Sequence, residues 1–145
     1  MVFVKRNVME EIVFYIPGRT DAAKRLVEAV EDAAPKAAIK TYRTAEALRK
    51  RLLPGTGGVL AAVVLASTKQ DLLSLMPLRE LLQSVRVIMI LPDADEVTLA
   101  VGWGMWPRFV SYADSDFHDV AGVLKKIVGT AIHARRTPGR WDSVR

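Results

Sequence analysis

The chain has 145 residues, a formal net charge of +5 and no cysteine, and 50% of its residues are hydrophobic. This composition fits one folded domain and excludes disulfides, thiolate metal sites and cysteine nucleophiles. No apolar run approaches the roughly 20 residues that a membrane-spanning helix needs, and no secretory signal is readable, so we expect a cytoplasmic protein without membrane association.

Short apolar runs alternate with helical patterns along the chain. The runs predict strands at residues 12–16, 37–42, 59–65, 87–91 and 109–112. The third and fourth runs are continuously apolar, which is typical of strands covered by helices on both faces. The second and fifth are more polar, as expected near a sheet edge. Apolar residues at helical spacing predict helices over 20–34 and 45–52 and a long last helix from Phe117.

Capping residues indicate where several helices begin. Thr44 precedes the second helix as a candidate N-cap. Thr68 with Asp71, and Asp93 with Glu96, have the spacing of a capping box, in which each side chain bonds to the other residue's backbone amide. The order βαβαβαβαβα with short connections predicts an α/β fold, with three α-β-α layers and a five-stranded parallel sheet.

Three stretches resemble the receiver domains of chemotaxis-type response regulators, which have a flavodoxin-like fold. TYRTAEALRKRL, from Thr41, is similar to their second strand and helix, and MPLRELL, from Met76, to the opening of their third helix. VIMILPDADEVTLAVGWG, from Val87, is similar to their fourth strand, loop and helix. The resemblance covers roughly residues 10–134, which leaves an N-terminal extension at 1–9 and a basic tail at 135–145. It implies a bacterial-type protein of two-component signalling.

The chemistry of receivers is missing from the corresponding positions. Receivers hold Mg²⁺ with an acidic pair after the first strand, phosphorylate an aspartate after the third, and read the phosphate with a hydroxyl and a lysine after the fourth and fifth. The resemblance places these groups at Pro17 and Gly18, Ala66, Leu91, and Tyr112, or Ser111 if the alignment slips by one residue. A methyl group accepts no phosphoryl group, and Mg²⁺ needs carboxylate oxygens.

We therefore expect a degenerate pseudo-receiver, a non-enzymatic and non-phosphorylatable regulatory module that acts by protein–protein interaction. We expect no cofactor and no metal. Asp71 lies five residues past the third strand, where its spacing from Thr68 favours helix capping over a role as a displaced phosphoacceptor. His118 and His133 lie fifteen residues apart in the last helix, too far to hold one ion together.

Two stretches contain candidate binding residues. Arg19 and Thr20 precede the first helix, where exposed amides and a guanidinium favour an anion or other ligand; an ordinary turn is the alternative. The segment VGWGMWPRF contains the candidate interface residues Trp103, Met105, Trp106 and Phe109. Aromatic residues and Met are enriched at interfaces, but tryptophans also cap cores. Gly102 and Gly104 favour an irregular connection here.

The basic tail gives an alternative function. It contains the candidate nucleic-acid residues Arg135, Arg136, Arg140 and Arg145. Such a tail favours sequence-tolerant nucleic-acid association, which we rank below a protein partner; a solvated helix end is the other interpretation. The resemblance to receivers also implies a possible homodimer. Small-molecule sensing is a further alternative, since Ala66, Leu91 and Tyr112 suit a neutral or aromatic ligand at the vacated strand ends.

Overall fold

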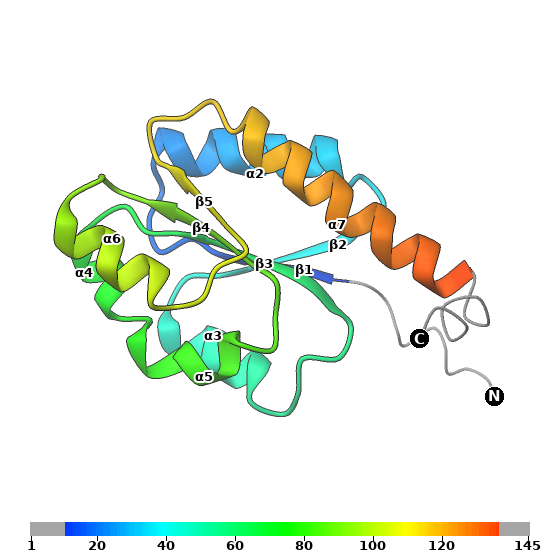
Figure 1. Ribbon diagram of the computed structural model, residues 1–145, viewed down its shortest axis with the longest axis horizontal. Helices are drawn as coiled ribbons and strands as arrows, with labels where there is room; N and C mark the ends of the chain where they lie inside the picture. The colour runs from blue at the N-terminus through cyan, green and yellow to red at the C-terminus, as the bar shows by residue number, and fades with distance from the viewer. Residues whose placement is uncertain (1–10, 137–145) are drawn as a thin grey trace.

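The apolar runs form one parallel sheet in the order β2-β1-β3-β4-β5 (Figure 1). The computed structural model describes residues 11–136. Its strands are β1 (Glu11–Tyr15), β2 (Ala38–Tyr42), β3 (Val59–Leu65), β4 (Val87–Leu91) and β5 (Phe109–Tyr112). Each strand boundary lies within one residue of its prediction, and the predicted five-stranded, flavodoxin-like α/β fold is confirmed.

Helices cover both faces of this sheet (Figure 1). Helices α2 (Asp21–Ala33) and α7 (His118–Arg136) lie side by side on one face. The other face carries α3 (Ala45–Leu52), α4 (Lys69–Leu73), the 3₁₀ helix η1 (Met76–Leu78), α5 (Arg79–Leu82) and α6 (Glu96–Trp103). The segment between β3 and β4 is therefore three short helical pieces, and Pro77 lies in the first turn of the 3₁₀ piece, where its missing amide costs no helical hydrogen bond.

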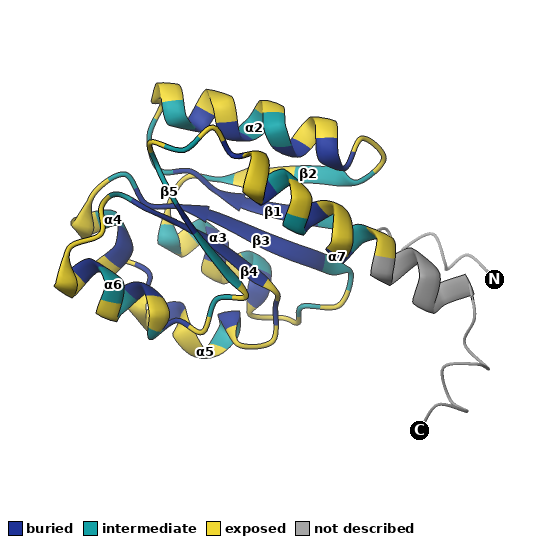
Figure 2. Ribbon diagram, turned by 45° about the horizontal axis from the view of Figure 1, so that its top comes forward, coloured by how far each residue is buried: buried dark blue, intermediate teal, exposed yellow. Residues whose placement is uncertain are grey.

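The sheet separates two apolar clusters. Alternate residues of β3 point to opposite faces, so Val63 joins the cluster under α2 and α7 while Ala62 and Val64 join the cluster under α3 to α6. All five residues of β4 are buried, whereas the edge strand β2 has none (Figure 2). Burial on both faces thus explains why the two central runs lack a polar alternation.

Threonine side chains cap three helices. Thr20 and Thr44 accept hydrogen bonds from the backbone of Ala23 and Ala47. Thr68 and Asp71 form the complete capping box that their spacing predicts. These bonds satisfy amide groups that a helix leaves without a partner in its first turn.

The second predicted capping box, between Asp93 and Glu96, is wrong. The carboxylate of Asp93 accepts a hydrogen bond from the amide of Asp95 at 3.0 Å, and α6 begins only at Glu96. A local turn of this kind competes with helix capping, because the same carboxylate is used two residues further along the chain. Glu96 is therefore the first residue of the helix and not its third.

The last helix continues into the predicted basic tail. Arg135 and Arg136 are the last residues of α7, so the helix extends beyond the predicted boundary of the tail. Arg140 and Arg145 lie outside the described residues. Within residues 11–136, no helix combines the length and apolar character needed to cross a membrane.

Candidate functional site

The C-terminal ends of the strands bring the receiver-like positions together. Leu91 pairs with Tyr112, and the amide of Ala66 donates to the carbonyl oxygen of Ile90 at 2.9 Å. Pro17 and Gly18 follow β1 on the same edge of the sheet. Open α/β sheets bind ligands at this edge, so residues predicted from separate stretches do meet where a receiver has its chemistry.

Apolar packing occupies this edge at β3 and β4. Ala66 and Leu91 are fully buried in the cluster under α3 to α6. Leu91 packs so closely on α6 that a Cβ atom built on Gly102 would lie 2.9 Å from its Cδ2 atom. Neither side chain is open to a ligand from solvent. The Leu91–Gly102 contact leaves no room for a side chain at Gly102, and α6 continues through this glycine to Trp103, where we expected an irregular connection.

The fifth strand ends in two residues with different surroundings. Ser111 is buried, and its hydroxyl donates to the carboxylate of Asp119 in the first turn of α7 at 3.2 Å. Tyr112 is half-buried and packs against the same cluster as Leu91. The Ser111–Asp119 contact was not predicted from the sequence. It joins β5 to α7 and gives the buried hydroxyl a partner.

The acidic residues near this edge have structural partners. Asp71 accepts hydrogen bonds from the amides of Ser67 and Thr68 at 3.0 and 3.2 Å, which confirms its predicted role in capping. Lys69 of α4 pairs with Asp95 before α6. Among the side chains that the structure describes, those of residues 11–129, no three histidine or acidic groups converge in a way that could hold a metal ion.

The candidate interface separates into exposed and buried residues. Trp103 and Trp106 are 54% and 68% exposed, so neither tryptophan caps the core. Met105 is fully buried under α6, and its predicted place in an interface is therefore wrong. Phe109 is half-buried against the cluster under α2 and α7. The chain turns sharply after α6, with Trp106 at a φ of 60°, and this turn directs Met105 inward and leaves the tryptophans in solvent.

Trp106 also borders a cavity of about 490 Å³ at the start of β4 and β5. Arg86 precedes β4 and Arg108 precedes β5, and both line this cavity. We call Trp106, Arg86 and Arg108 the tryptophan–arginine patch. The two arginines were not predicted, because only the parallel pairing of β4 with β5 brings these distant residues together.

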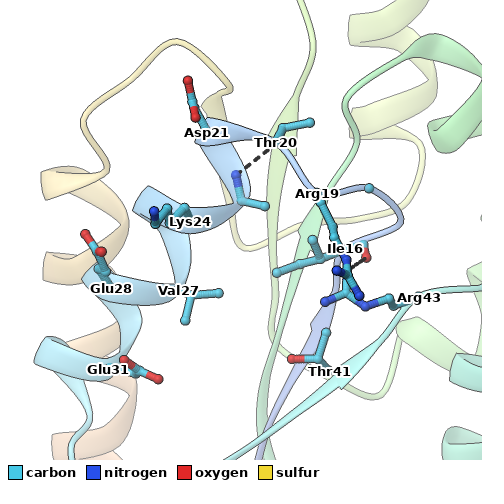
Figure 3. A pocket seen from close by; sticks show the side chains of 12 residues that line it. Ile16, Arg19, Thr20, Asp21, Lys24, Val27, Glu28, Glu31, Thr41 and Arg43 are labelled. Atoms are coloured by element: carbon cyan, nitrogen blue, oxygen red, sulfur yellow. Dashed lines mark hydrogen bonds between the residues drawn. The ribbon is translucent and has the colours of Figure 1, made fainter.

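A larger groove, of about 600 Å³, lies between α2 and the end of β2 (Figure 3). Arg19, a predicted ligand residue, lines it together with Arg43, which the sequence did not single out. Thr20 also lines the groove, but its hydroxyl accepts the hydrogen bond from Ala23 that caps α2. His118, in contrast, is an exposed residue that contacts Asp116 at 3.2 Å.

Sequence comparison and structural comparison give different results. No family model matches the sequence, and no curated protein matches it. Solved structures do match. A Burkholderia pseudomallei protein described as pilus-assembly related superposes with a TM-score of 0.62 at 17% identity, covering 84% of this chain and 91% of that one.

Two response-regulator structures match as well. The phosphorylated cyanobacterial phytochrome response regulator RcpA gives a TM-score of 0.58 at 10% identity, over 82% of this chain and 91% of that one. A response regulator receiver domain from Rhodospirillum rubrum gives a TM-score of 0.53 at 11% identity, over 81% of this chain and 89% of that one. At these identities the likeness shows the fold, which is that of a receiver domain.

Proposed function

We propose that this chain is a receiver-like regulatory module that binds a partner protein and does not accept a phosphoryl group. The receiver fold supports the class of module. The residues at the strand ends support the second part, because Ala66 has no nucleophilic oxygen and Leu91 presents no hydroxyl. Both side chains are buried, and Leu91 packs against Gly102, which favours a scaffold that keeps its shape without phosphorylation.

The observation that carries the binding role is the exposure of Trp106 in a strained turn. A bulky side chain rarely adopts a φ near +60°, and such a conformation costs on the order of 1–3 kcal/mol. Trp106 is also 68% exposed and lies beside two arginines, and tryptophan and arginine are enriched among the residues that dominate the binding energy of interfaces. Strain and exposure at one residue are explained together if that residue contacts a partner.

The charge beside Trp106 indicates the chemistry of the partner. Arg86 and Arg108 are exposed, line the same cavity, and form no ion pair with an acidic residue of the described chain. A guanidinium recognises carboxylates through paired hydrogen bonds. The partner we propose is therefore a protein with an acidic segment that places one apolar or aromatic side chain against Trp106.

The test uses the full chain as bait in a lysate of its source, followed by titration of the purified partner. Truncation of a hot-spot residue costs about 2 kcal/mol or more, which is roughly a thirtyfold loss of affinity. We expect Trp106→Ala and Arg108→Ala to cause losses of this size. Leu53→Ala is the matched control, since Leu53 is an apolar residue with similar exposure, 55%, at the end of α3.

Three outcomes contradict this proposal. Equal binding by Trp106→Ala and Leu53→Ala variants would remove the patch from the interface. Capture that disappears with nuclease or moderate salt would favour nucleic-acid association through the arginines of the tail. A dimer by light scattering that Trp106→Ala converts to a monomer would make the occupant a second copy of the chain.

A further inference from the structure

The groove between α2 and β2 brings two arginines from separate loops to one place. Arg19 belongs to the loop between β1 and α2, and Arg43 directly follows β2. Figure 3 shows their side chains pointing toward one another above Thr41. The Nη1 atom of Arg43 donates to the carbonyl oxygen of Ile16 at 3.3 Å, which fixes this guanidinium at the end of the sheet.

Neither of these two cations has an acidic partner among the described residues. No carboxylate of the described residues pairs with either guanidinium, whereas Arg49 and Arg51 pair with Glu46 and Glu11. Two like charges in one groove repel each other, and an anion between them removes this cost. Guanidinium groups bind phosphate through paired hydrogen bonds, so the phosphate group fits this end of the groove.

The wall of the groove opposite the two arginines carries acidic side chains. Glu28 and Glu31 project from the second half of α2, and Figure 3 shows them across the groove from the arginines. Ile16 and Val27 give an apolar surface between the two charged ends. Carboxylates accept hydrogen bonds from hydroxyl and amino groups but repel phosphate. Asp21 also lines the groove, but its carboxylate points away from the arginines (Figure 3).

The length and volume of the groove limit the size of the ligand. Eleven residues separate Thr20 from Glu31, which corresponds to about 16 Å along a helix. The volume of about 600 Å³ lies within the range of roughly 300–1,000 Å³ that is typical of small-molecule sites. A free phosphate would fill only the arginine end.

We propose that this groove binds a nucleoside phosphate. Its phosphates lie between Arg19 and Arg43, its apolar ring faces contact Val27, and its hydroxyl or amino groups donate to Glu28 and Glu31. Gly18, a receiver-like position after β1, lines this groove, but Ala66, Leu91 and the tryptophan–arginine patch do not. The groove therefore gives the proposed module a second input that does not depend on phosphorylation.

The test is calorimetric titration of the full chain with ADP, GDP, adenosine and inorganic pyrophosphate in phosphate-free buffer. We expect a nucleoside diphosphate to bind more tightly than adenosine or pyrophosphate and to raise the melting temperature. Arg19→Ala and Arg43→Ala should each weaken binding by at least about tenfold. Glu31→Gln should weaken it less, because the amide keeps an acceptor oxygen.

Arg49→Ala is the matched control, because it removes the same charge from an exposed position on α3. Arg19→Ala is the decisive variant, since Arg19 makes no hydrogen bond or ion pair within the described chain and its loss should not lower the unliganded melting temperature. The proposal is overturned if neither diphosphate binds at millimolar concentration, if Arg49→Ala weakens binding as much as Arg19→Ala, or if pyrophosphate alone binds as tightly as ADP.

Discussion

The contact between Leu91 and Gly102 predicts that alanine substitutions at two helical glycines, Gly102 and Gly122, change the stability of the protein in opposite directions. Alanine is favoured over glycine in a helix by about 1 kcal/mol, so propensity alone predicts that Gly102→Ala stabilises the protein. The new Cβ atom, however, would lie 2.9 and 3.1 Å from the two Cδ atoms of Leu91. Carbon atoms in contact prefer about 3.5–4.0 Å, and Leu91 is fully buried, so in a close-packed interior its side chain moves only if its neighbours shift too.

Overpacking of this kind costs about 1–3 kcal/mol. After the gain in propensity is subtracted, we expect Gly102→Ala to lower the free energy of unfolding by about 1 kcal/mol. The control is Gly122→Ala, because Gly122 lies inside α7 and a Cβ atom there would meet nothing within 4 Å. This variant should raise the free energy of unfolding by about 0.5–1 kcal/mol.

Urea unfolding followed by circular dichroism measures both changes. A double-mutant cycle separates this contact from other effects. Leu91→Ala in the original chain should lower the free energy of unfolding by about 2–5 kcal/mol. In the Gly102→Ala background the same substitution also removes the clash, so its cost should be smaller by at least about 1 kcal/mol. The reasoning is refuted if the Gly102→Ala and Gly122→Ala variants are stabilised equally, because the helix would then tolerate a side chain against Leu91.

Three further predictions concern other residues. Trp106→Gly should raise the free energy of unfolding by about 1 kcal/mol in a thermal melt while abolishing partner binding, because glycine relieves the strain at a φ of 60°; a destabilised variant would contradict this. Burial, with a smaller contribution from Asp71, raises the pKa of Tyr15 above 10. The folded state therefore keeps the phenolic proton of Tyr15 to a higher pH than the unfolded state does. The free energy of unfolding should fall as the pH rises above about 10, and it should fall less in the Tyr15→Phe variant. Arg51→Ala should cost about 1 kcal/mol in urea unfolding, because Arg51 pairs with the half-buried Glu11 at 2.8 Å; an unchanged midpoint would show that water replaces the pair.

The strands were predictable because burial determines their sequence directly. Residues 59–65 and 87–91 are apolar on both faces because helices cover both faces of the sheet, and the short length of these runs favours strands over buried helices. The capping box at Thr68 is also a local signal, since both of its hydrogen bonds lie within four residues. Local patterns of this kind can be read without the fold.

The errors and omissions have causes that the sequence pattern alone does not show. The letters GWGMWP do not show which side chain faces the sheet, because the helix ends within them and the turn at Trp106 decides that Met105 is buried. Arg43 lines the groove because the fold brings the end of β2 close to α2, and the local sequence does not show this. Asp93 failed as a cap because a competing turn uses its carboxylate.

The central claim is that a receiver fold acts here without phosphorylation. The most direct measurement is the intact mass of the full chain after incubation with acetyl phosphate and Mg²⁺, beside a phosphorylatable receiver as a positive control. We predict no addition of a phosphoryl group under conditions that modify the control, because Ala66 and Leu91 offer neither a nucleophile nor a phosphate contact. An adduct released by hydroxylamine, for example on Asp71, would contradict the account and restore phosphotransfer to this module.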